Sequence, residues 1–129
     1  MVNDKRHILI AEDDCLLLCS MRFALRCGGY HVTMVTNGVN ALQKIIYGSV
    51  RYDLLVTDVQ MPLCNGIQLL DNLKRERISI PVIAISAYDD YHTMKCLSEK
   101  GCRCFIGKPF SSTELKNCID NLLQLRSTI

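Results

Sequence analysis

The sequence has 129 residues, of which 49% are hydrophobic and 22% are charged, and its formal net charge is +2. These values are typical of a single globular domain and exclude a disordered chain; the basic residues form no block that would follow a phosphate backbone, so we expect no direct nucleic-acid partner. No apolar run approaches about 20 residues and no secretory signal is visible, so we expect a cytoplasmic protein that does not enter the membrane.

Five short apolar runs alternate with longer stretches of helical spacing, which is the pattern of repeated βα units. The runs HILIA, DLLVT and PVIAIS are continuously apolar, as strands are when helices cover both faces of a sheet. The expected strands are His7 to Ala11, His31 to Val35, Leu54 to Thr57, Val82 to Ser86 and Cys104 to Gly107. The sequence therefore predicts a parallel sheet between two layers of helices.

Apolar side chains recur on one helical face in four of the five stretches between these runs. The expected buried faces are Leu18, Met21 and Leu25; Val39, Leu42 and Ile46; Ile67, Leu70 and Leu73; and Leu115, Ile119 and Leu122. The fourth stretch, Tyr91 to Lys100, offers only Met94 and Leu97. We expect it to form the least buried helix and to be a candidate moving part. Ser111 and Glu114 predict a capping box at the start of the last helix.

The eight cysteines are scattered along the chain, and no CxxC pair occurs. The two that are closest in sequence, Cys102 and Cys104, are too few for a four-ligand metal site. We therefore expect reduced cysteines that act as small apolar side chains, which suits a reducing compartment.

Polar residues end four of the five expected strands. They are Glu12, Asp13 and Asp14 after the first strand, Asp58 after the third, Ser86 after the fourth and Lys108 after the fifth. Ligands of open parallel sheets bind at the carboxyl ends of the strands, and if the strand order is 2-1-3-4-5, the carboxylates of the first and third strands converge there. Two carboxylates 4 Å apart repel by about 4 kcal/mol at an effective dielectric near 20, so a cation is required, and oxygen ligands suit Mg²⁺.

Asp58 is the best placed of these carboxylates to act as a nucleophile toward phosphorus. Lys108 and Ser86 would meet the charge on the oxygens of a transferring phosphoryl group. Taken singly, each residue has an ordinary explanation, since acids favour helix N-termini, aspartate favours turns, serine caps helices and lysine is usually solvated. Their joint placement at one edge of the sheet favours the functional interpretation.

The motifs ILIAEDD, DLLVTDVQMPLCNG, VIAISA and CFIGKPF occur in the order and spacing of response-regulator receiver domains, and nearly the whole chain resembles that family. The resemblance implies an α/β fold of the flavodoxin-like kind, a (βα)5 doubly wound parallel sheet with strand order 2-1-3-4-5. It implies one receiver domain over residues 1–129. It also implies a signalling phosphoacceptor, which is not an enzyme in the usual sense although it assists its own phosphorylation and dephosphorylation.

The same resemblance implies a role for each motif residue. Asp58 corresponds to the phosphoacceptor, Lys108 to the lysine of the site, and Ser86 with Phe105 to the switch pair. The implied Mg²⁺ ligands are Glu12, Asp13, Asp58 and the backbone carbonyl of Gln60. Phe105 keeps the switch ring but lacks the hydroxyl of the commoner tyrosine.

The resemblance further implies partners and two local features. The phosphoryl group would come from a sensor histidine kinase or a histidine phosphotransfer protein, and a downstream target or output domain would contact the fourth helix, fifth strand and fifth helix. The peptide bond before Pro109 is expected to be cis, and Tyr88 is expected to flank the route of the hydrolytic water and slow dephosphorylation. Whether the chain is a stand-alone regulator or part of a larger protein stays open.

Three alternatives differ in class from this interpretation. A phosphatase of the haloacid dehalogenase class needs a second aspartate two positions after the nucleophile, where this chain has Gln60. A flavodoxin-like cofactor binder needs hydroxyl or glycine-rich phosphate contacts after the first strand, where this chain has three acids. A pseudo-receiver, which keeps the fold as an interaction module without phosphorylation, remains the main alternative.

Overall fold

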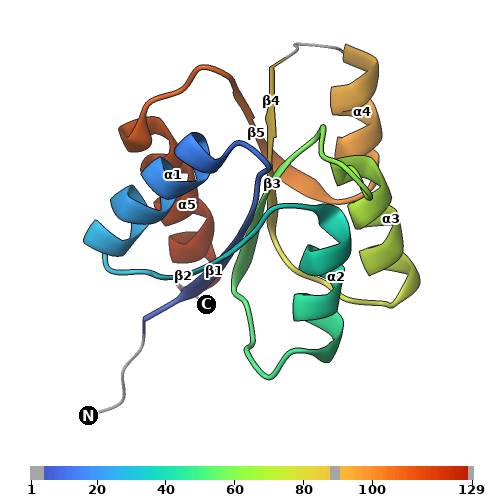
Figure 1. Cartoon of the computed structure of the whole chain (residues 1–129), viewed down its shortest axis with the longest axis horizontal. Helices are drawn as coiled ribbons and strands as arrows, with labels where there is room; N and C mark the ends of the chain where they lie inside the picture. The colour runs from blue at the N-terminus through green and yellow to red at the C-terminus, as the bar shows by residue number, and fades with distance from the viewer. Residues whose placement is uncertain (1–4, 88–90, 128–129) are drawn as a thin grey trace.

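The structure, a computed structural model, describes residues 5–87 and 91–127, with side chains described as far as residue 124. Within these residues strands and helices alternate along the chain (Figure 1). The strands are β1 (His7–Ala11), β2 (His31–Val35), β3 (Leu54–Asp58), β4 (Val82–Ser86) and β5 (Cys102–Gly107). The helices are α1 (Cys15–Cys27), α2 (Gly38–Tyr47), α3 (Gly66–Arg75), α4 (Tyr91–Glu99) and α5 (Ser112–Ser127). None of the helices in the described part is long and apolar enough to cross a membrane.

The strands form one parallel sheet in the order β2-β1-β3-β4-β5, which confirms the predicted topology. β1 and β3 are therefore neighbours, with Ala11 beside Thr57, and β3 continues to Asp58, which lies beside Ile85 of β4. Two strand boundaries differ from the prediction, because Asp58 belongs to β3 and β5 already begins at Cys102. All five carboxyl ends lie at one edge of the sheet, which is where the predicted site residues occur.

Helices cover both faces of the sheet (Figure 1): α1 and α5 lie on one face, and α2, α3 and α4 on the other. Alternate residues of the central strands point into the two layers. In β1, Ile8 and Ile10 pack on the α1–α5 side, whereas Leu9 packs on the other side, and all three are fully buried. The continuously apolar strand runs of the sequence follow from this arrangement, because both sides of the sheet are core.

The predicted buried faces of α1 and α3 are confirmed in outline, whereas that of α2 is only partly right, because Leu42 packs against the core but Val39 does not. In α2 the buried residues are Gly38 and Ala41, and Val39 is 37% exposed. The cause is a close approach between segments, since a Cβ atom at Gly38 would lie only 2.1 Å from the backbone oxygen of Cys64. The small residues of α2 therefore face the core at its start.

The last two helices, α4 and α5, agree in part with the helices that the sequence predicts. Leu97 is the buried residue of α4, so this helix has the thin burial that the sequence predicts. At α5, Ser111 Oγ accepts a hydrogen bond from the backbone N–H of Glu114 at 3.0 Å, which is one half of the expected capping box. Leu115 and Ile119 of α5 are fully buried, as predicted.

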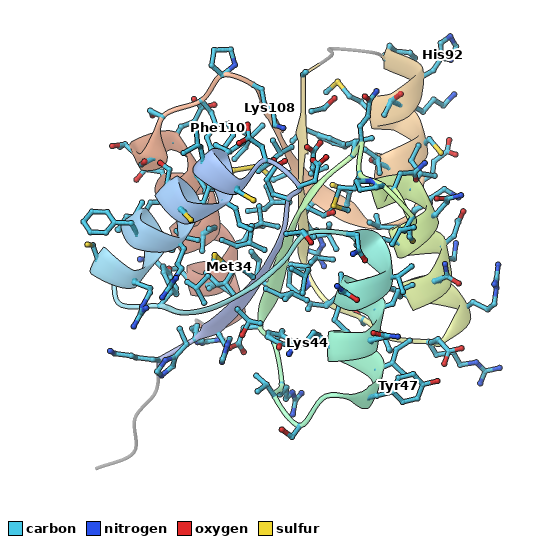
Figure 2. All side chains as sticks on the ribbon, viewed as in Figure 1. Met34, Lys44, Tyr47, His92, Lys108 and Phe110 are labelled. Carbon is cyan, nitrogen blue, oxygen red and sulfur yellow. A yellow bond between two sulfur atoms is a disulfide. The ribbon has the colours of Figure 1, made fainter. Side chains whose placement is uncertain are left out.

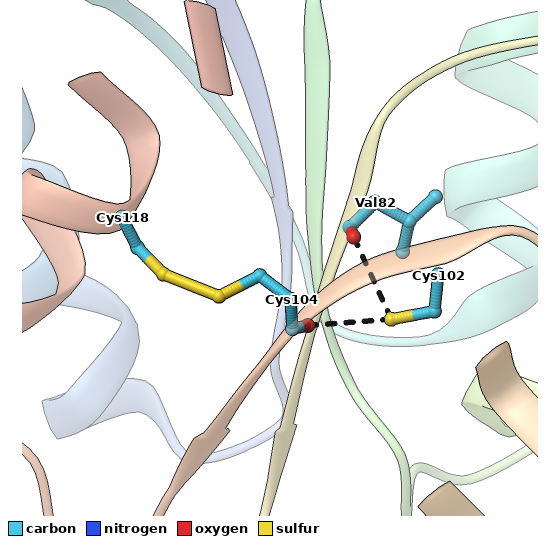
Figure 3. The surroundings of a disulfide bond; sticks show 4 residues. All are labelled: Val82, Cys102, Cys104 and Cys118. Carbon is cyan, nitrogen blue, oxygen red and sulfur yellow. Dashed lines mark hydrogen bonds between the residues drawn. A yellow bond between two sulfur atoms is a disulfide. The ribbon is translucent and has the colours of Figure 1, made fainter. Parts of the chain in front are cut away.

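The expectation that all cysteines are reduced is wrong for one pair. Cys104 of β5 and Cys118 of α5 form a disulfide (Figure 3), while the other six cysteines, all within the described residues, are free. The sequence did not predict this pair, because the two cysteines are 14 positions apart and only the packing of α5 against β5 brings them together. Cys64 and Cys102 are buried and serve as small core residues, as predicted.

Candidate functional site at the carboxyl edge of the sheet

Lys108, two acidic residues and their neighbours form a compact polar cluster at the carboxyl edge of the sheet. Glu12 directly follows β1, Asp58 ends β3 and Lys108 directly follows β5. The Lys108 ammonium lies 2.8 Å from Asp58 Oδ2 and 3.0 Å from Glu12 Oε1. Figure 2 labels Lys108 at this end of the sheet, in the loop that leads from β5 to α5. The structure thus brings together three predicted site residues from three separate strands.

The carboxylates of this cluster are deeply buried. Glu12 is 0% exposed and Asp58 is 5% exposed, so bulk water reaches only a small part of Asp58. Backbone N–H groups of the following loops support them: Asp14 donates to Glu12 Oε2 at 3.1 Å, and Gln60 donates to Asp58 Oδ1 at 3.1 Å. The two loops therefore orient the carboxylates, and the remaining oxygen of each carboxylate lies next to Lys108.

Asp13 completes a group of three carboxylates that could hold a metal ion. One carboxylate oxygen from each of Glu12, Asp13 and Asp58 lies within 4.8 Å of the other two. The buried Glu12 Oε1 receives no hydrogen bond from any described residue, and its contact with Lys108 is an ion pair alone. An oxygen-only donor set with an unsatisfied buried carboxylate oxygen fits Mg²⁺, which binds through a few carboxylates and keeps several waters.

Burial and mutual repulsion change the acid–base properties of the cluster. Burial raises the pKa of Glu12 to about 7, against the stabilising contacts of the Asp14 N–H and Lys108, and nearby Asp58 adds to the rise. Burial alone would lower the pKa of Lys108, but the hydrogen bond to Asp58, the ion pair with Glu12 and the negative charge of both carboxylates outweigh it, and the pKa is raised. Lys108 therefore stays cationic and available to a negatively charged group.

The three acidic residues after β1 have two different roles. Asp14 caps α1, since its side chain accepts from the backbone N–H groups of Leu16 and Leu17, as expected for a helix N-terminus. Glu12 and Asp13 are thereby left to the cluster. On the opposite side of the site, the peptide bond between Lys108 and Pro109 is cis, which confirms that prediction.

Ser86 and Phe105 lie on the strands where the sequence placed them. Ser86 ends β4 and is half-buried, and its backbone carbonyl accepts from the Lys108 N–H at 2.8 Å. Phe105 is half-buried in β5 and packs against the core layer beneath α2, α3 and α4. Gln60 is exposed beside Asp58, and Tyr88 lies outside the described residues.

Sequence reasoning assigned no role to Gly66, which the structure places directly against the site. Gly66 begins α3, and a Cβ atom there would lie 2.9 Å from the backbone oxygen of Asp58. Asn65 caps this helix in a capping box with Gln68, so the helix start is fixed close to β3. The available signal was the Asn-Gly pair in the loop after Asp58, a turn signal that does not by itself reveal a close approach.

The protein-family model of the response regulator receiver domain matches residues 8–120 of the chain. Among curated proteins, the chain is 37% identical over 116 residues to the DNA-binding transcriptional regulator NtrC of Rhizobium meliloti, covering 90% of this chain and 24% of that protein. It is 34% identical over 119 residues to the response regulator SaeR of Staphylococcus aureus, covering 91% of this chain and 50% of that protein. The chain thus spans half or less of the length of these relatives.

Solved structures agree with the sequence relatives. The Francisella response regulator 1452 receiver domain is 30% identical, with a TM-score of 0.87 and coverage of 95% of this chain and 100% of that chain. The signal receiver domain of a signal transduction histidine kinase from Syntrophus aciditrophicus is also 30% identical, with a TM-score of 0.83 and coverage of 96% and 94%. Both superpose along almost the entire chain.

Proposed function

Because the chain belongs to the response-regulator receiver family, we propose that it is a phosphoacceptor of a two-component phosphorelay, with residues 1–129 forming the receiver domain and Asp58 as the acceptor. The observation that carries this proposal is the convergence of Glu12, Asp13 and Asp58 within 4.8 Å, beside a lysine ammonium 2.8 Å from Asp58. Asp58 is the central member, because it ends the middle strand of the sheet and contacts Lys108 directly. The setting we propose is the cytoplasm.

The proposed reaction transfers a phosphoryl group from a phosphohistidine of a sensor kinase or phosphotransfer protein. A carboxylate oxygen of Asp58 forms a bond to phosphorus while the phosphorus–nitrogen bond breaks, and the imidazole keeps the electron pair and takes up a proton. Lys108 can follow the transferred group, since its ammonium needs only to exchange a carboxylate oxygen for a phosphoryl oxygen. Glu12, Asp13, Asp58 and the Gln60 carbonyl would hold Mg²⁺, which supplies positive charge to the phosphoryl oxygens.

The proposed output of the domain is a shift between two conformations. The negative phosphoryl group on Asp58 draws the Ser86 hydroxyl toward it, and the Phe105 ring turns into the space beside β4. The thin burial of α4, whose buried residue is Leu97, makes this helix the part that moves at least cost. A downstream target or output domain would then contact α4, β5 and α5, which we call the output surface.

Phosphate uptake by Asp58→Asn tests the proposal. We expect labelling by a phosphorylated histidine kinase, or by the small donor phosphoramidate, to disappear in this variant, because an amide oxygen is a poor nucleophile toward phosphorus. Asp53→Asn is the matched control: it alters an aspartate at the other end of β3 and should be labelled normally. Undiminished labelling of Asp58→Asn would remove Asp58 from its role.

Beryllofluoride, a mimic of the phosphoryl group, separates the phosphoacceptor from the pseudo-receiver. With Mg²⁺ present, we expect it to bind stoichiometrically and to shift the backbone amide signals of Asp58, Lys108 and the output surface. A protein that takes neither phosphate nor beryllofluoride would be a non-phosphorylated interaction module.

A further inference from the structure

We propose that Cys104 and Cys118 form a reversible thiol–disulfide modification site that restrains the output surface when oxidised. The inference rests on the proposed function, because it assigns a regulator to the same switch. The relevant chemical partners are low-molecular-weight disulfides of the glutathione type as oxidants and dithiols as reductants.

The bond joins two elements of the output surface. Cys104 lies in β5, an edge strand of the sheet, and Cys118 lies in α5 (Figure 3). Cys104 immediately precedes Phe105, the proposed switch residue, so the bond attaches to the backbone one residue away from the moving ring. A covalent link at this position connects the strand that carries the switch to the helix that a partner would contact.

Because of a bulge in β5, Cys104 and not Cys102 lies on the same side of the sheet as Cys118. The β4–β5 register shifts between Val82 and Ile83, so that Cys102 lies beside Val82 and Cys104 lies beside Ile83. Residues two apart normally share a face of a strand, but the extra residue at this point sends them to opposite faces. Cys104 accordingly packs with the α1–α5 layer, whereas Cys102 packs with the α2–α3–α4 layer.

The third thiol of this region is held away from the bond. Cys102 Sγ donates to the backbone oxygens of Cys104, at 3.3 Å, and Val82, at 3.5 Å (Figure 3). Burial raises the pKa of Cys102, which keeps it in the unreactive thiol form. Internal exchange by Cys102 is therefore blocked by position and by protonation, and the state of the pair depends on thiols from solution.

The solvent exposure of Cys104 and Cys118 lies between that of the buried cysteines and that of the exposed ones. Cys104 and Cys118 are half-buried, whereas Cys64 and Cys102 are buried and Cys19 is exposed on α1. A small thiol or disulfide can reach a half-buried sulfur on an edge strand more readily than one in the core. The pair thus combines mutual proximity, which favours the bond, with enough exposure for exchange.

The proposed step balances as a thiol–disulfide exchange. A thiolate of Cys104 or Cys118 attacks the external disulfide, forms a mixed disulfide and releases one external thiol. The second cysteine then attacks the mixed disulfide, closes the Cys104–Cys118 bond and releases the second external thiol. Two electrons and two protons pass from the protein to the external disulfide, and a dithiol reverses both steps.

The bond acts on the switch by favouring one arrangement of β5 relative to α5. It is compatible with the arrangement in which Lys108 pairs with both Asp58 and Glu12. In the proposed switch the Phe105 ring of β5 turns into the space beside β4, and the bond opposes any accompanying shift of β5 that separates Cys104 from Cys118. Oxidation should therefore weaken binding of a phosphoryl mimic without altering the residues that contact it.

A beryllofluoride titration of the oxidised and the reduced full chain tests the inference. We expect the oxidised protein, prepared with glutathione disulfide, to bind beryllofluoride about fivefold or more weakly than protein kept in a dithiol, the lower end of typical coupling between sites. Cys118→Ser and, independently, Cys104→Ala should bind equally under both conditions. Cys96→Ser, a matched change at a half-buried cysteine of α4, should keep the full difference.

Three results would overturn the inference or separate it from the proposed function. Peptide mapping that finds no Cys104–Cys118 linkage after oxidation would overturn it, as would equal beryllofluoride affinities in the two states. If neither state binds beryllofluoride, the proposed function fails, and the modification site is then judged by amide signals. Signals of Phe105 and Lys108 that differ between oxidised and reduced protein would support it, and identical signals would reject it.

Discussion

The two ends of the sheet treat their polar groups in opposite ways. At the amino end, His7 Nε2 and Thr33 Oγ1 share a hydrogen bond of 2.8 Å, the His7 backbone N–H donates to Asp53 Oδ2 at 2.8 Å, and Arg6 pairs with Asp53. At the carboxyl end, three carboxylates lie close together beside Lys108, which pairs with two of them, and a buried oxygen of Glu12 has no hydrogen bond from the described residues. The polar groups named at the amino end thus find partners within the protein, whereas those at the carboxyl end are left incompletely paired.

The difference indicates which end binds a ligand. Folding alone disfavours a cluster with three negative groups and one positive group, because like charges at short distance repel and burial disfavours ionisation. Such a cluster persists where a bound cation or anion completes it, which is why perturbed titratable groups gather at functional sites. The polar groups of the amino end instead pair with one another, and their hydrogen bonds join β1 to β2 and to the residue before β3.

The largest effect that would sharpen this comparison comes from removing the positive charge of Lys108, which pairs with Glu12 and Asp58. In Lys108→Ala we expect phosphate uptake from phosphoramidate to slow by about 10² to 10³, the usual consequence of losing one group that stabilises transition-state charge. Arg6→Ala, which removes a cation at the amino end, should leave the rate within about twofold. Single-turnover labelling measures both, and equal rates in the two variants would mean that the ends do not differ in this respect.

A second, smaller effect concerns Mg²⁺ affinity. Asp13→Asn removes one of the three proposed carboxylate ligands and should weaken Mg²⁺ binding by about tenfold or more, equivalent to about 1.4 kcal/mol. Asp53→Asn makes the same chemical change at the paired end and should leave the affinity unchanged. Isothermal titration with Mg²⁺ reports both values, and an Asp13→Asn protein that binds Mg²⁺ as tightly as the parent would remove Asp13 from the ligand set.

The same comparison explains which parts of the structure the sequence could predict. Apolar strand runs are a direct signal of a buried parallel sheet, and polar residues at the strand ends are a direct signal of a site at its edge. The sequence therefore predicted the topology and the proximity of Glu12 to Asp58. The face of α2 did not, because the contact of Gly38 with Cys64 is decided by the approach of two distant segments. The Cys104–Cys118 bond was missed for the same reason, since helical and strand periodicity describe each element but not the pairing between them.

A third test of the contrast between the two ends uses two variants whose free energies of unfolding should change in opposite directions. Asp53→Asn should lower the free energy of unfolding by about 1 to 2 kcal/mol, because it weakens a charge-assisted bond to the His7 N–H and the pair with Arg6. Asp13→Asn, in a buffer without divalent cations, should raise it by up to about 1 kcal/mol through reduced repulsion near Asp58. Urea unfolding gives both values. Destabilisation of similar size in both variants would contradict the proposed contrast.

The smallest expected effect is the pH dependence of stability that originates at the amino end. Burial and then the neighbouring His31 lower the pKa of His7 from 6.5, against the opposing charge of Asp53. Because the pKa is lower in the folded than in the unfolded state, this contribution to stability is complete above pH 6.5 and is lost as the pH falls below it.

His7→Gln removes this titration and should flatten the curve of unfolding free energy between about pH 7 and about pH 5.5. His92→Gln, at an exposed histidine of α4, is the matched control and should keep the slope of the parent. If His7→Gln and the parent lose stability in parallel over this range, the neutral hydrogen bond between His7 and Thr33 does not carry the pH dependence of this end. The acid sensitivity of the fold would then have to arise at other titrating groups.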